Sequence, residues 1–300
     1  MYNHCMKKIK VFILKKILFI LLIIVLAIAL LLIFQKSKSS RLASAVIEET
    51  PTATPTIEPT PTSSITPTPT PMSFEDMDKN FGPCVKVEVL MYHHIQSEEE
   101  AKTENQTGLS VDPKFFREHL QYLKDKNYTV IGAKDLINFF NGSEQLSGKL
   151  AMITLDDGYG DNYTNAYPIL KEFGSKAIIF TPTGLVNNPD YLTWDEISQM
   201  KDLVYFANHT WSHHSQSGST ETISKEISLA DTQLKDKGLN EQKIFAYPYG
   251  STNQEEINIL KSYGYNLAFT TKHGNIMCKG KSFELPRIRV GNAPLSQYGL

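Results

Sequence analysis

Cysteine is nearly absent from this sequence. Among 300 residues there are three: Cys5 near the start, then Cys84 and Cys278. A disulfide-rich framework is therefore excluded. Cys84 and Cys278 lie near the two ends of the region after residue 75, so they can form one disulfide in an oxidising compartment. Two buried, unpaired thiols are the alternative, and the sequence leaves both open.

Basic residues are outnumbered after residue 41, where 22 Lys and Arg stand against 32 Asp and Glu. The first 41 residues hold eight Lys and Arg and no Asp or Glu, and the whole chain has a formal charge of -2, which leaves -10 for the rest. An acidic surface repels the phosphate backbone of nucleic acids. We therefore expect no nucleic-acid partner.

Long apolar runs are absent except near the N-terminus. Ile17–Phe34 contains 18 residues without a charge, close to the ~20 that cross a bilayer. The small residues at 42–45 also resemble the cleavage site of a signal peptide, but the run exceeds the usual apolar core of ~7–15 residues. We expect an uncleaved transmembrane helix; the protein is secreted if the segment is cleaved.

The flanking charges predict the orientation of this helix. Five lysines precede the span, and Lys36, Lys38 and Arg41 follow it, which favours a cytoplasmic N-terminus. Thr50–Pro71 is a Pro/Thr tract without apolar periodicity, typical of an extended spacer. The predicted organisation is an anchor over residues 1–41, a linker over 42–75 and a domain over 76–300 outside the cell.

Within 76–300, short apolar runs alternate with amphipathic stretches, and this pattern predicts strands alternating with helices. The alternation favours an α/β fold, a distorted barrel of about seven parallel strands covered by helices. The runs predicted as strands are 87–95, 128–131, 150–155, 176–183, 203–208, 243–250, 267–271 and 285–290, and those predicted as helices are 112–127, 133–140, 162–173, 193–202, 221–238 and 253–264.

Polar residues stand where several of these strands end, and that end of a parallel barrel carries the chemistry. His209 and His213 are four apart, so a helical turn would place both imidazoles on one face. We interpret His214, one residue further, as structural. Two imidazoles and a carboxylate form a typical three-ligand metal site with open positions.

Two adjacent carboxylates, Asp156 and Asp157, follow another apolar run. Neighbours in a strand point to opposite faces, so both reach one pocket only if the strand ends there, which Gly158 permits. Two ionised carboxylates in one pocket repel each other, and a divalent cation removes the conflict. Capping of the next helix by one of them is the alternative.

Two motifs resemble those of the polysaccharide deacetylases, the NodB-homology carbohydrate esterases. "TLDDG" at 154–158 is similar to the family's T-F-D-D-G, and "HTWSH" at 209–213 to its H-[ST]-x-x-H. The resemblance implies a distorted (β/α) barrel and removal of acetyl groups from N-acetylglucosamine units. It also implies Asp156 as general base and a divalent metal ion, usually zinc, held by Asp157, His209 and His213.

A third motif departs from the family pattern. In "FAYPYG", Ala246 stands where the family has arginine, while Tyr249 matches the donor of a backbone N–H to the oxyanion. The "LMYHHI" segment is similar to that of the poly-N-acetylglucosamine deacetylases, which makes His93 the candidate acid. Arg287 could replace the missing arginine beside Asp156. A core histidine and a structural ion pair are the alternatives for these two residues.

The sequence therefore predicts a membrane-anchored, metal-dependent N-deacetylase acting on exopolysaccharide or cell-wall glycan outside the cell. An O-acetyl esterase acting on a glycan such as xylan uses the same residues. A non-catalytic glycan-binding module on the same fold is the third hypothesis. The intact base and metal positions favour an enzyme.

Overall fold

The computed structural model describes residues 72–213 and 219–300. The predicted membrane span, the Pro/Thr tract and His214 lie outside these ranges. Within them, every helix is too short or too polar to cross a bilayer.

Seven parallel strands form a closed barrel, which confirms the predicted α/β class and strand number. Their order is β2-β12-β10-β9-β8-β7-β6, and pairing of β2 with β6 closes the ring. The strands are β2 (Glu88–Tyr92), β6 (Leu150–Asp156), β7 (Ala177–Thr181), β8 (Val204–Asn208), β9 (Ile244–Ala246), β10 (Leu267–His273) and β12 (Leu285–Arg289). An eighth strand, β5 (Thr129–Val130), pairs with the start of β6.

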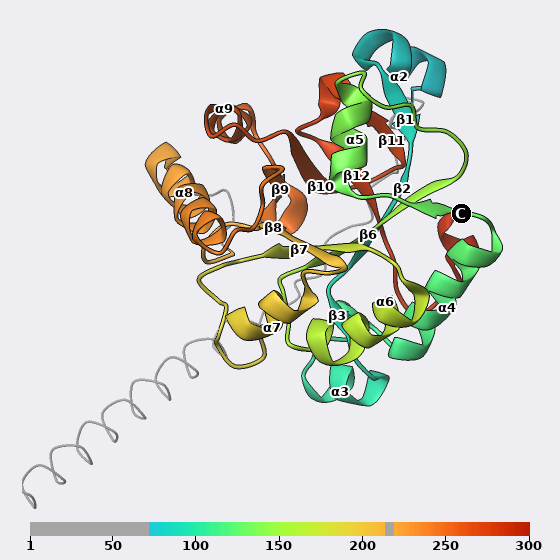
Figure 1. The fold of residues 1–300 in the computed structure, drawn as a ribbon, viewed down its shortest axis with the longest axis vertical. Helices are drawn as coiled ribbons and strands as arrows, with labels where there is room; N and C mark the ends of the chain where they lie inside the picture. The colour runs from blue at the N-terminus through green and yellow to red at the C-terminus, as the bar shows by residue number, and fades with distance from the viewer. Residues whose placement is uncertain (1–71, 214–218) are drawn as a thin grey trace, which may run out of the picture. The chain divides into compact units, whose positions relative to one another are not determined.

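Helices surround the strands (Figure 1). They are α2 (Phe74–Phe81), α3 (Glu98–Thr103), α4 (Pro113–Asp125), α5 (Ala133–Phe140), α6 (Tyr167–Phe173), α7 (Trp194–Met200), α8 (Thr220–Asp236) and α9 (Gln254–Ser262). Short helical turns are η1 (Asn162–Ala166), η2 (Pro248–Gly250), η3 (Lys279–Lys281) and η4 (Leu295–Tyr298). Two small sheets pair β1 (Cys84–Lys86) with β11 (Ile276–Cys278), and β3 (His94–Ile95) with β4 (Ser110–Val111).

Local sequence explains why the helices begin where they do. In α4, the Asp112 side chain accepts a hydrogen bond from the Lys114 amide, and Pro113 occupies the first turn, where its missing N–H costs nothing. The buried face of α4 carries Phe116, His119, Leu120 and Leu123, as the helical spacing predicts. The short helix α2 buries none of its residues and α3 buries only Ala101, and the sequence pattern did not indicate these helices.

The strands are buried on both faces. All seven residues of β6 are buried, so the strand appears in the sequence as an uninterrupted apolar run. One cluster includes Val89, Met152 and Phe180 of the strands together with Leu136 and Phe140 of α5. A second cluster packs strand residues against α4 and α6. This rigid core fixes where the carboxyl end of each strand lies.

Cys84 and Cys278 form a disulfide, which decides between the two alternatives left open by the sequence. They are direct partners in the antiparallel pairing of β1 with β11. The bridge joins the segment before the first barrel strand to the segment before the last one.

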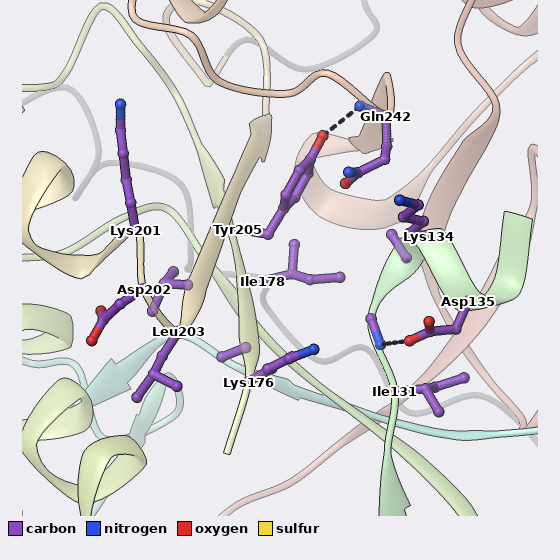
Figure 2. A pocket seen from close by; sticks show the side chains of 14 residues that line it. Ile131, Lys134, Asp135, Lys176, Ile178, Lys201, Asp202, Leu203, Tyr205 and Gln242 are labelled. Atoms are coloured by element: carbon purple, nitrogen blue, oxygen red, sulfur yellow. Dashed lines mark hydrogen bonds between the residues drawn. The ribbon is translucent and has the colours of Figure 1, made fainter. Parts of the chain in front are cut away.

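A cavity of about 250 Å³ lies where β7 and β8 begin (Figure 2). Its rim includes Lys134, Lys176 and Lys201. At one side, the Tyr205 hydroxyl accepts a hydrogen bond from the backbone amide of Gln242. None of the predicted site residues lines this cavity. Because it is at the amino ends of the strands, it belongs to the end of the barrel opposite the predicted chemistry.

Candidate active site

The turn after β6 brings both aspartates into the site. Asp156 is the last residue of β6, while Asp157 and Gly158 both have left-handed backbone conformations, with φ of 72° and 65°. This sharp turn ends the strand alternation that would send the two side chains apart. Asp156 and Asp157 are both buried, with 3% and 7% of their surface exposed.

Asp156 forms a two-pronged ion pair with Arg287 of β12. Arg287 Nη1 donates to Asp156 Oδ1 at 2.7 Å, and Nη2 donates to Oδ2 at 2.6 Å. The arginine is fully buried, and its Nε donates to the Thr270 carbonyl at 2.9 Å. Burial opposes ionisation of the aspartate, but the charge and hydrogen bonds of Arg287 hold the pKa of Asp156 below its usual value. Asp156 is therefore ionised at neutral pH.

Asp157, His209 and His213 converge on one point. Asp157 Oδ1 lies 3.4 Å from His209 Nε2 and 3.1 Å from His213 Nε2. One ligand atom from each of the three residues lies within 4.8 Å of the other two. His209 Nδ1 donates to the Ala246 carbonyl at 2.7 Å, which fixes the tautomer and leaves the Nε2 lone pair free for a metal ion.

The chemistry of these donors fits a divalent metal ion. Asp157 Oδ1 is buried and accepts no hydrogen bond, although buried carboxylate oxygens are usually satisfied. One carboxylate and two imidazoles are ligands that suit zinc and similar ions.

The loop carrying the histidines is not helical, so the predicted reason for their proximity is wrong. Residues 209–213 form an irregular turn with left-handed residues at Thr210 and His213. Glu226 of α8 holds this turn, because it accepts hydrogen bonds from the amide and hydroxyl of Ser212 at 2.8 and 3.0 Å. The spacing identified the pair, but tertiary contacts bring it together.

His93 directly follows β2, at the same end of the barrel as the two aspartates. Burial lowers the pKa of His93, while the charges of Asp156 and Asp157 act in the opposite direction. The neighbouring His94 pairs instead with Asp161, whose Oδ2 lies 2.5 Å from His94 Nδ1. Of the two histidines, His93 is thus the one whose pKa the charges of Asp156 and Asp157 influence.

Tyr249 borders the site at η2. Its backbone is left-handed, with φ of 61°, and its side chain is 68% exposed with the ring 4.8 Å from that of His213. Gly250 also has positive φ, and any side chain there would collide with Thr271. This close approach holds the Tyr249 turn against β10.

Three supporting residues had no predicted role, although Thr154 is the first residue of the "TLDDG" motif. Thr154 lies next to the ion pair and receives a hydrogen bond of 3.3 Å from Arg287 Nη1. Tyr159 and Asp161 follow the aspartates closely and contact His94. The position of Tyr159 and Asp161 just after "DDG" was the only indication in the sequence that they belong to the site. Contacts with His94, some 65 residues earlier, determine where their side chains lie.

A parallel barrel with carboxylates and imidazoles gathered at the carboxyl ends of its strands has the architecture of an enzyme. Comparison with known proteins identifies the class of enzyme. Residues 143–268 match the sequence profile of the family described as polysaccharide deacetylase. The Bacillus subtilis (strain 168) protein YxkH, named as a polysaccharide deacetylase, is 31% identical over 68% of this chain and 71% of its own length.

Two further similarities extend the comparison. The structure of the Streptococcus pyogenes deacetylase PplD in complex with acetate has a TM-score of 0.64 and 30% identity, covering 69% of this chain and 92% of that one. The poly-β-1,6-N-acetyl-D-glucosamine N-deacetylase of Escherichia coli (strain K12) is 24% identical over 68% of this chain, which spans 36% of that protein's length. The chain belongs to the polysaccharide deacetylase family, whose members are carbohydrate deacetylases and hydrolyse carbon–nitrogen bonds other than peptide bonds.

Proposed function

We propose that this protein is a metal-dependent N-deacetylase that removes acetyl groups from N-acetylglucosamine units of a polysaccharide outside the cell. The observation that carries the proposal is the cluster of Asp157, His209 and His213 beside an arginine-paired Asp156. An ionised base next to a three-ligand site is the arrangement that hydrolysis of an acetamide requires.

Asp157, His209 and His213 would hold the metal ion, with zinc favoured by this ligand set. The ion supplies a Lewis acid that lowers the pKa of water and polarises a carbonyl. Ala246, through its carbonyl, keeps the His209 ring oriented toward the ion.

Asp156 is the proposed general base. Its carboxylate is ionised, buried and fixed through both oxygens by Arg287, so it can accept the proton of the attacking water without first reorienting. In this proposal Arg287 replaces the family arginine that is missing at Ala246.

His93 is the proposed acid that protonates the leaving amine. Burial lowers the pKa of His93, which makes its imidazolium a stronger acid but reduces the protonated fraction at neutral pH. The two carboxylates partly compensate because they favour the protonated form. The backbone N–H of Tyr249 is the proposed donor to the oxyanion.

The proposed location is the cell surface, with an anchor over residues 1–41, a linker over 42–75 and the enzyme domain over 76–300. The disulfide between Cys84 and Cys278 supports an oxidising compartment. The E. coli relative is named for poly-β-1,6-N-acetylglucosamine, which supports a substrate of this class.

The test is acetate release from N-acetylglucosamine oligomers, peptidoglycan and acetylxylan by the metal-loaded protein. Asp156→Asn should abolish release while the protein still binds metal, whereas Asp157→Asn should lose both. Activity retained in Asp156→Asn would refute the mechanism. Release from acetylxylan alone would favour the O-acetyl esterase, and release from none would favour a glycan-binding module.

A further inference from the structure

Asn208 is the last residue of β8 and directly precedes His209, where the turn that carries two of the candidate metal ligands begins. It is fully buried. Its Oδ1 accepts a hydrogen bond of 2.8 Å from the Thr210 amide. Its Nδ2 donates to the Ile227 carbonyl of α8 at 3.1 Å and to the Tyr265 hydroxyl at 2.6 Å. One side chain therefore joins the start of this turn to α8 and to the segment before β10.

The backbone on either side of His209 is held by hydrogen bonds. Thr210 has a left-handed conformation with φ of 66°, which is unfavourable for a β-branched residue and persists only where surrounding contacts fix it. An asparagine that accepts from the amide two residues further on stabilises such a turn. The His209 amide donates to the Thr181 carbonyl at 3.2 Å. The direction in which the His209 side chain leaves the backbone thus depends on Asn208 and on β7.

The Tyr265 hydroxyl is itself fixed by a charged pair. It donates to Asp231 Oδ1 at 3.1 Å, and both carboxylate oxygens of Asp231 lie 2.6 Å from Lys243 Nζ. Burial and the Asp231 charge hold the pKa of Tyr265 well above its usual value, so the phenol keeps its proton for Asp231 and accepts from Asn208. These contacts fix the hydroxyl and, through it, the orientation of the Asn208 amide.

We propose that Asn208 is a positioning residue that sets the geometry of the candidate metal site by fixing the backbone around His209. Its amide oxygen and amino group are both engaged by the protein, so it acts through His209 and not as a ligand. Groups outside the ligand set that orient a metal ligand strengthen metal binding. The inference rests on the metal ion of the proposed function.

The opposite end of the barrel offers matched control residues. Asn240 is 2% exposed, and its Oδ1 accepts hydrogen bonds from the Ile244 amide at 3.0 Å and from the Tyr205 hydroxyl at 3.3 Å. Asn240 and Tyr205 thus form the same kind of buried pair as Asn208 and Tyr265, but before β9 instead of after β8. The test compares Asn208→Ala with Asn240→Ala, and Tyr265→Phe with Tyr205→Phe.

Three measurements are made on each variant. Zinc affinity is measured by competition with a chelator, and the visible spectrum of the Co²⁺-loaded protein reports the ligand geometry. Urea unfolding of the metal-free protein reports stability. Both asparagine variants should unfold at lower urea concentrations than the wild type, because each loses buried hydrogen bonds. Only Asn208→Ala should also bind zinc about 10- to 100-fold more weakly and show an altered Co²⁺ spectrum.

Tyr265→Phe should weaken zinc binding by less than Asn208→Ala, because Asn208 keeps its contacts with Thr210 and Ile227. Tyr205→Phe should keep the zinc affinity of the wild type. Wild-type affinity in Asn208→Ala, or equal weakening in Asn208→Ala and Asn240→Ala, would overturn the inference. If Asn208→Ala does not fold, wild-type affinity in Tyr265→Phe overturns it. Failure of the wild type to bind metal would refute the proposed function instead.

Discussion

Replacing Arg287 by methionine would leave the buried carboxylate of Asp156 without its cation. Two hydrogen bonds of 2.7 and 2.6 Å join these groups, and neither side chain has appreciable access to water. Removal of one partner from a buried ion pair typically costs about 3–5 kcal/mol. We expect Arg287→Met to lose that much stability in urea unfolding.

The same substitution should shift the pH dependence of the reaction. Burial raises the pKa of Asp156, and the charge of Arg287 is the largest effect that lowers it. Without Arg287 this pKa rises, so the fraction of ionised base falls and the acidic limb of the rate profile moves to higher pH. At pH 7 the loss of acetate release should approach the roughly 100- to 10,000-fold contribution of a general base.

Two control variants separate charge from geometry. Arg287→Lys keeps the charge but loses the two-pronged contact, so it should show a smaller shift. The double variant Asp156→Asn/Arg287→Met should be more stable than Arg287→Met, because it buries no unpaired charge. If Arg287→Met retained the wild-type pH profile at full metal loading, the tuning of Asp156 by Arg287 would be disproved.

Two further predictions concern the stability of the domain. Because the disulfide joins residues separated by 194 positions, Cys84→Ser/Cys278→Ser should lose about 2–4 kcal/mol in urea while acetate release stays unchanged; equal stability with and without the bridge would contradict this. His119 is buried, and in its neutral form it accepts from Tyr92 and donates to the Ala293 carbonyl. Burial lowers the pKa of His119 from 6.5, so folding favours the neutral form, and stability should be complete above pH 6.5 and decline as pH falls below it. In His119→Gln, unfolding measured from pH 7.5 to pH 5 should show a weaker decline than in the wild type, and parallel curves would exclude His119 as the cause.

The sequence predicted the barrel well because parallel strands buried on both faces appear as apolar runs. The run 150–155 became β6, and the helix expected over 133–140 has those bounds in the structure. The cluster of Asp157, His209 and His213, a candidate metal site, was predictable because its residue types are informative and its strand ends converge. The geometry of the His209–His213 turn could not be predicted, because Glu226 of α8 holds this turn through tertiary contacts.

Supporting residues escaped prediction because their partners are distant in the chain. Tyr159 stacks on His94, and Asp161 pairs with the same histidine. Neither contact can be predicted from the local periodicity of the sequence. Residues that orient others have no characteristic spacing of their own. They become visible only when the packing of loops from different strands is known.

Ala246 and Arg287 illustrate why a missing motif arginine need not leave Asp156 without a cation. In a closed parallel barrel the carboxyl ends of all strands surround one space, so a side chain from β12 can reach the same carboxylate as one from β9. Arg287 reaches Asp156 from 131 positions further along the chain. Ala246 still contributes, but through its carbonyl, which accepts the His209 Nδ1–H. In this chain β12 therefore supplies the positive charge beside Asp156, although β9 carries Ala246 at its end.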